Sequence, residues 1–117
     1  MTLQECYAKL GGDYEGTLGR LSSEKLVEKF ALKFLADDSY HLLEESIQIG
    51  NYSNAFRAAH TLKGVSLNLG FTKMYQVSDA LTEALRDSNQ LEDEKLFEEV
   101  KEEYQRTIDL LQELQNS

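Results

Sequence analysis

Proline is absent from this chain of 117 residues, and this absence limits what the chain can fold into. A proline ring inside a helix removes a backbone hydrogen bond and clashes with the preceding turn. Without proline, no segment is barred from a helix on that ground. Apolar residues also recur at intervals of three and four along most of the sequence, which places them on one face of a helix. We therefore predict an all-α fold.

Start residues such as Ser and Asn, and stop residues such as Gly, divide this pattern into separate helices. The expected helices span residues 2–10, 14–21, 24–36, 39–49, 51–69, 71–87 and 92–115. In the 39–49 helix we expect Tyr40, Leu42, Leu43 and Ile47 to face the core. Short connections between them favour antiparallel neighbours. We predict one domain over residues 1–117, with an antiparallel up-down four-helix bundle in residues 22–116. Short N-terminal helices in residues 1–21 are expected to pack on this bundle.

The charge balance argues against several classes of partner. The chain has 12 basic and 21 acidic residues and a net charge of −9, which disfavours nucleic acid and anionic membrane surfaces. No stretch approaches the roughly 20 apolar residues of a membrane span. The single cysteine, Cys6, excludes an internal disulfide and suits a reducing compartment. We expect a cytoplasmic monomer, either free or cut from a larger membrane-attached kinase.

The stretch from Gly50 to Gly70 predicts a helix with two different faces. One face has the spacing of a core stripe and consists of Ala55, Ala58, Ala59, Leu62, Val65, Ser66 and Leu69. At about 100° per residue, His60 lies on the opposite side of the helix. The residues around it are Ser53, Phe56, Arg57, Lys63, Gly64 and Leu67. This helix is therefore expected to present an imidazole to solvent.

His60, Lys63 and Gly64 together suit an imidazole that carries a phosphoryl group. Histidine forms covalent intermediates, and a free imidazole is largely neutral and nucleophilic at pH 7. A glycine inside a helix costs about 1 kcal/mol relative to alanine. Gly64 lies one turn after His60, where it leaves space for a bulky group, and Lys63 brings a positive charge to that space. The other interpretation of His60 is an ordinary polar residue on a helix surface.

The run Ala59-His60-Thr61-Leu62-Lys63-Gly64, followed by Gly70, resembles the signature of histidine-containing phosphotransfer (HPt) domains. That signature is alanine, histidine, any residue, leucine, lysine and glycine, with a second glycine six residues later. The Gly50-Asn51-Tyr52 entry to the helix is also similar to the family. The resemblance covers roughly residues 22–115.

The resemblance implies a four-helix bundle that relays phosphoryl groups between His60 and the aspartates of receiver domains. The implied partners are response-regulator receiver domains, a hybrid sensor kinase, or both. Magnesium is expected on the receiver domain, and no cofactor or metal is expected on this chain. Lys63, and less directly Arg57, are expected to offset the charge of the phosphoryl group. Phe56 and Leu67 are expected to flank His60 as an apolar docking patch.

The resemblance also points to the helix after Gly70. Many family members use a glutamine or glutamate there to hold the second nitrogen of the imidazole. That position falls at Thr82 in this chain, which we place with Arg57, Phe56 and Leu67 among the residues expected to contact phosphate or a partner, although threonine is shorter. Water, or the neighbouring Glu83, is the alternative partner for the ring nitrogen.

Other chemistries lack their motifs in this sequence. There is no Walker-type phosphate loop and no dinucleotide fingerprint, so we expect a phosphoryl carrier without autokinase activity. One cysteine and two distant histidines provide no zinc framework, and the acidic segment from residue 92 to 103 lacks the spacing of a calcium loop.

Two rival interpretations concern the histidines themselves. His41 has no cation or glycine one turn away and is expected to be an ordinary surface or boundary residue. The dimerisation helix of histidine kinases usually has an acidic residue after its histidine and a proline a few positions later, whereas Thr61 follows here and proline is absent. The remaining alternative is a helical protein-interaction module whose histidine does not turn over.

Overall fold

Helices form all the regular structure in the computed structural model, which describes residues 1–117. The elements in chain order are α1 (Leu3–Leu10), α2 (Tyr14–Leu21), α3 (Glu24–Lys33), the 3₁₀ turn η1 (Phe34–Ala36), α4 (Ser39–Gln48), α5 (Tyr52–Leu69), α6 (Thr72–Leu85) and α7 (Lys95–Gln115). The all-α prediction is confirmed. The expected 24–36 helix is present as α3 followed by η1.

Local side-chain and glycine chemistry sets several helix ends. Thr2 and Glu5 form a capping box at the start of α1, and the Asn51 side chain accepts a hydrogen bond from the Asn54 amide at the start of α5. Gly70 ends α5 with φ of 72°, a left-handed conformation that glycine adopts at little cost. The ends of α5, the helix that carries His60, are therefore encoded locally.

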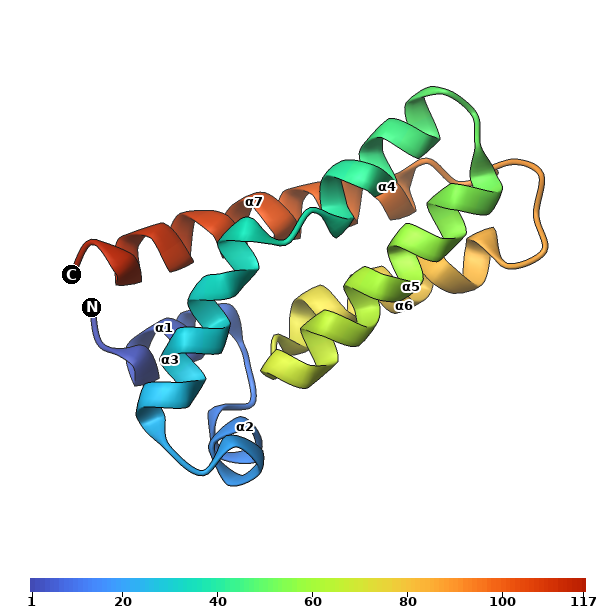
Figure 1. Cartoon of the computed structure of the whole chain (residues 1–117). Coiled ribbons are helices and arrows are strands. Elements are labelled where there is room, and N and C mark those ends of the chain that lie inside the picture. The colour runs from blue at the N-terminus through green and yellow to red at the C-terminus, as the bar shows by residue number, and fades with distance from the viewer.

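The four helices α4 to α7 run antiparallel along the long dimension of the molecule (Figure 1). α5 packs against α4 on one side and against α6 on the other, and α6 packs against α7. α3 contacts α5 and α7, and η1 contacts α7. Of the two N-terminal helices, α1 packs on α7 and α2 packs on α3. The predicted four-helix bundle with additional N-terminal helices is confirmed.

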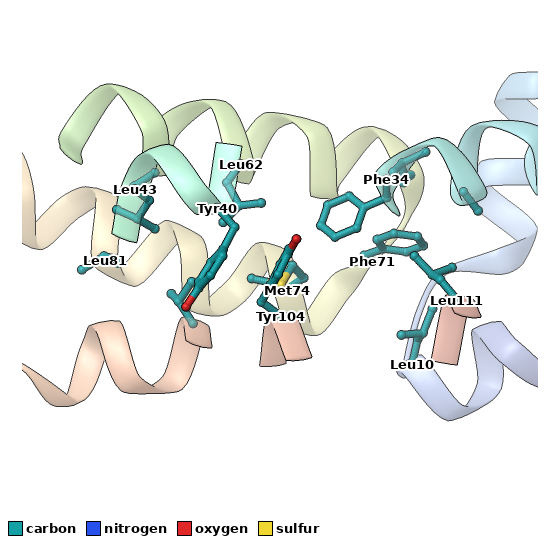
Figure 2. Packing of buried hydrophobic residues seen from close by; sticks show 14 of the residues in the cluster. Leu10, Phe34, Tyr40, Leu43, Leu62, Phe71, Met74, Leu81, Tyr104 and Leu111 are labelled. Atoms are coloured by element: carbon teal, nitrogen blue, oxygen red, sulfur yellow. The ribbon is translucent and has the colours of Figure 1, made fainter. Parts of the chain in front are cut away.

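The buried hydrophobic residues form one continuous cluster to which the N-terminal helices and the bundle both contribute. Phe34 of η1 meets Phe71 edge-to-face, with ring centroids 5.4 Å apart. Tyr40 of α4 stacks on Tyr104 of α7 at 4.0 Å. Figure 2 shows these two aromatic contacts within the buried cluster. The first contact links η1 to the start of α6, and the second links α4 to α7.

The N-terminal helices cap the C-terminal end of α5. The Tyr7 hydroxyl donates to the Leu69 carbonyl at 2.7 Å, Thr17 Oγ1 donates to the same carbonyl at 3.2 Å, and Arg20 donates to the Asn68 carbonyl at 3.0 Å. Burial raises the pKa of Tyr7 well above its ordinary value, so its hydroxyl keeps the proton that it donates. The last carbonyls of a helix lack partners within the helix, and a cation there complements the helix dipole. These contacts anchor the end of α5.

One inward-facing residue of α4 was predicted wrongly. Leu42 was expected to point into the core, but it is 50% exposed. Tyr40 and Leu43 define the buried face of α4, and Leu42 lies about 100° around the helix from Leu43. It borders a groove of about 330 Å³ between α4 and α5.

None of the helices combines the length and apolar character that a membrane crossing needs.

Candidate functional site

His60 stands on the outer face of α5. The residue before it, Ala59, and the residue two positions later, Leu62, are fully buried, whereas the imidazole is exposed to solvent. This difference follows from the helical repeat, because residues one or two positions apart point about 100° or 160° away from each other. The predicted separation into a core face and an outer face is present in the structure.

The surface one turn after His60 is open. A Cβ atom placed on Gly64 would have no heavy atom within 4 Å, and the residue does not have a positive φ. Neither the backbone conformation nor the packing of α5 therefore requires glycine at this position. An incoming group can approach His60 across Gly64 without meeting a side chain there.

Phe56 borders the opposite side of the imidazole. Its ring stacks on His60 with a centroid separation of 6.1 Å and an angle of 12° between the planes. Phe56 is half-buried against the core, and the guanidinium carbon of Arg86 lies 5.1 Å from the centre of its ring. Phe56 thus connects the histidine to a cation on α6. It supports the imidazole on one side while Gly64 leaves the other side free.

Lys63 does not extend freely toward solvent. Its Nζ lies 3.1 Å from Asp79 Oδ1 on α6, and its side chain is 20% exposed. The sequence predicted that Lys63 brings a positive charge to the space beside His60, and the structure adds that Asp79 of the antiparallel helix α6 pairs with this lysine. A phosphoryl group on His60 would share Lys63 with Asp79 or compete with it.

A second ion pair on α6 lies next to the histidine. Arg86 Nε and Nη2 donate to the two carboxylate oxygens of Glu83 at 3.1 and 3.0 Å. The hydrogen bonds from Arg86 lower the pKa of Glu83, and the nearby charges of Lys63 and His60 act in the same direction. Glu83 therefore lies within electrostatic range of Lys63 and His60. Glu83 was expected as an alternative partner of the ring nitrogen, but its pairing with Arg86 was not expected.

The α6 partners of the α5 residues can be found by counting residues on either side of the turn between the two helices. Lys63 and Asp79 each lie eight residues from Phe71, and Phe56 and Arg86 each lie fifteen residues from it. In an antiparallel helix pair, residues equally distant from the turn lie at the same level. The same rule puts His60 at the level of residue 82, immediately beside Glu83.

Arg57 lies on the same outer face of α5 as His60, at the edge nearest α4. It is exposed and takes part in no ion pair within the chain. With Leu42, Asn54 and Thr61 it lines the groove between α4 and α5. Arg57 is therefore a cation close in sequence to His60 that has no internal carboxylate partner.

The comparison with protein-family models gives a single result for this chain. Residues 32–116 match the Hpt domain model. The chain belongs to the Hpt domain family. Domains of this family have a histidine phosphotransfer role in phosphorelays and work with receiver domains and kinases. No curated protein and no solved structure matches the chain.

The remaining predicted site residues of this Hpt domain divide into two groups. Leu67 is 58% exposed on the outer face of α5, where a partner can contact it. Thr82 is fully buried, and its hydroxyl donates to the Ser78 carbonyl of its own helix at 2.6 Å. The structure corrects the expectation that Thr82 contacts phosphate or a partner, because at the level of His60 its side chain points into the core. Glu83 occupies the outward position instead.

The second histidine of the Hpt domain has different surroundings. The ring of His41 meets Tyr40 and Tyr104 edge-to-face at 5.6 and 5.9 Å, on the α4–α7 side of the bundle. His41 itself takes part in no ion pair. No group of three or more His, Cys, Asp or Glu side chains is arranged to hold a metal ion.

Proposed function

We propose that His60 is the phosphoacceptor of this Hpt domain and relays a phosphoryl group between receiver-domain aspartates. The observation that supports this most strongly is the exposed imidazole beside the open surface at Gly64. His41 is also exposed, but its ring meets Tyr40 and Tyr104, and no glycine lies one turn away from it. Family membership makes a phosphorelay the context in which such a histidine acts.

The proposed step exchanges one bond for another. The unprotonated ring nitrogen of His60 attacks the phosphorus of an aspartyl phosphate on the receiver. A P–N bond forms while the P–O bond to the aspartate breaks, and the electron pair of that bond stays on the released carboxylate. In the onward step, the carboxylate of a second receiver attacks the same phosphorus, and the neutral imidazole leaves.

The neighbouring side chains have separate roles in this proposal. Lys63 and Arg57 offset the negative charge of the phosphoryl group, and a charged hydrogen bond of this kind contributes about 1–3 kcal/mol. Gly64 leaves room for the receiver's active site. Phe56 and Leu67 provide apolar contact area next to the histidine. Magnesium and most of the catalytic groups belong to the receiver domain.

The same proposal covers partners and setting. The chain acts as a carrier and does not phosphorylate itself from ATP. It meets response-regulator receiver domains, a hybrid sensor kinase, or both, as a monomer in the cytoplasm. Residues 1–117 act as one domain, which is supported by the shared core cluster and by the contacts of Tyr7, Thr17 and Arg20 with the end of α5.

Transfer from phosphorylated receivers tests the proposal. The wild-type chain and the His60→Gln and His41→Gln variants are incubated with a panel of receivers carrying labelled aspartyl phosphate. Acid-labile, base-stable label is expected on the wild type and on His41→Gln, and none on His60→Gln. Label that persists in His60→Gln contradicts the assignment. A wild-type chain that binds receivers but takes no label would support an interaction module instead.

A further inference from the structure

The Glu83–Arg86 pair on α6 borders His60 but has no role in the proposed transfer step. Its partners meet through two hydrogen bonds, and their side chains are 54% and 47% exposed. Arg86 also lies over the Phe56 ring, which in turn stacks on His60. The pair is therefore placed beside the phosphorylation site and is open to solvent.

We propose that Arg86 exchanges Glu83 for the phosphoryl group on His60, and that the released Glu83 carboxylate opposes the phosphorylated state. This inference rests on the proposed role of His60. Arg86 and Glu83 thus act with opposite signs on the same group. Together they set how readily the domain keeps or gives away its phosphoryl group.

The chemistry of the guanidinium favours the exchange. Arginine binds phosphate oxygens as well as carboxylates through two parallel N–H donors. An exposed ion pair contributes little free energy because water screens it, so Arg86 can leave Glu83 at low cost. The Phe56 ring attracts the guanidinium through its π face and keeps it near His60 during the change of partner.

The carboxylate has the opposite effect once Arg86 has moved. The hydrogen bonds from Arg86 lower the pKa of Glu83 and keep it negatively charged, and the charges of Lys63 and His60 add to this effect. Before transfer, a carboxylate near the imidazole is neutralised by Arg86. After transfer, the same carboxylate faces a phosphoryl dianion, and two like charges at short range repel. The site is therefore expected to release the group more readily than one without Glu83.

In the test, the chain of residues 1–117 is phosphorylated in the absence of any receiver. Potassium phosphoramidate, a small phosphodonor, is used to phosphorylate His60, and the ³¹P signal of the phosphohistidine is followed as a function of pH. A nearby cation stabilises the phosphoryl dianion and lowers its titration midpoint, and a nearby carboxylate raises it. Arg86→Gln is expected to raise the midpoint by about half a pH unit, and Glu83→Gln to lower it by about the same amount.

Three further measurements make the test specific. Arg86→Lys is expected to restore part of the effect, because it keeps the charge but loses the two-point contact. Glu102→Gln is the control for Glu83→Gln, because it removes one negative charge from an exposed residue of another helix, α7. It is expected to leave the titration midpoint unchanged. In the wild type, the Arg86 side-chain ¹⁵N–¹H signal is expected to shift when His60 is phosphorylated.

The possible results separate the two proposals. If phosphoramidate does not label His60 in the wild type, both the phosphoacceptor assignment and the exchange are overturned. If His60 is labelled but the Arg86 signal does not move, or the midpoints of Glu83→Gln and Arg86→Gln match that of the wild type, the exchange alone is overturned.

Discussion

Replacing Gly64 by alanine is predicted to stabilise the protein while it slows phosphoryl transfer. Gly64 lies inside α5 without a positive φ, and a Cβ atom added to it would meet no heavy atom within 4 Å. Alanine at this position should therefore raise the free energy of unfolding by about 1 kcal/mol, because it favours the helix more than glycine does and causes no clash. For a chain of this size, that raises the unfolding midpoint by about 4 °C. Urea and thermal unfolding followed by circular dichroism measure both quantities.

The expected effect on transfer has the opposite direction. A methyl group one turn after His60 occupies part of the space across which a receiver approaches, and the side chain of Gly64→Gln occupies more of it. Transfer rates from a phosphorylated receiver should therefore fall from wild type to Gly64→Ala to Gly64→Gln. Gly19 of α2 provides a matched control, because a Cβ there also meets nothing within 4 Å. Gly19→Ala should leave transfer unchanged.

Two results would refute this reasoning. A Gly64→Ala protein that is less stable than the wild type would show that α5 needs glycine at this position for a structural reason. A Gly64→Gln protein that accepts phosphoryl groups as fast as the wild type would show that the open surface has no part in receiver approach. The combination of higher stability and slower transfer supports the argument that this glycine serves function at the expense of stability.

Further substitutions test other parts of the structure by urea unfolding. Gly70→Ala should lose at least about 1–2 kcal/mol, since φ is 72° and the new Cβ would lie 2.7 Å from the Asp13 carbonyl oxygen; an unchanged stability would contradict this. Tyr7→Phe should lose about 1 kcal/mol with the hydrogen bond to Leu69, and no loss would argue against the N-terminal cap. Thr82→Val should cost at most about 1 kcal/mol and leave transfer intact, because the hydroxyl is buried; slower transfer would restore a role for Thr82.

Much of the fold was predictable from local patterns. The apolar spacing, the Asn51 cap and the left-handed Gly70 define α5 without reference to any other helix. The same periodicity places His60 outside and Ala59 and Leu62 inside. Local patterns were less reliable at Leu42, because the buried face of α4 depends on which neighbours Tyr40 and Leu43 meet.

The electrostatics of the site were not predictable in the same way. The sequence showed Lys63 near His60 but not its pairing with Asp79 at 3.1 Å. It directed attention to Thr82 at the correct level of α6, yet the side chain turned out to be buried. The rotation of α6 about its own axis decides which of two adjacent residues faces outward, and that rotation is set by packing of the whole core.

By itself, the sequence determined an antiparallel helical bundle with one imidazole on the outer face of a central helix, because helix periodicity, caps and glycine stops act over a few residues. The tertiary structure decided which groups surround that imidazole. Asp79 reaches Lys63, and Arg86 reaches Phe56, only because the turn at Gly70 sets the register of α6 on α5. The N-terminal helices donate hydrogen bonds to the end of α5 only after the chain has folded back on itself. Contacts between distant residues depend on the packing of the entire core, and no short stretch of sequence contains that information.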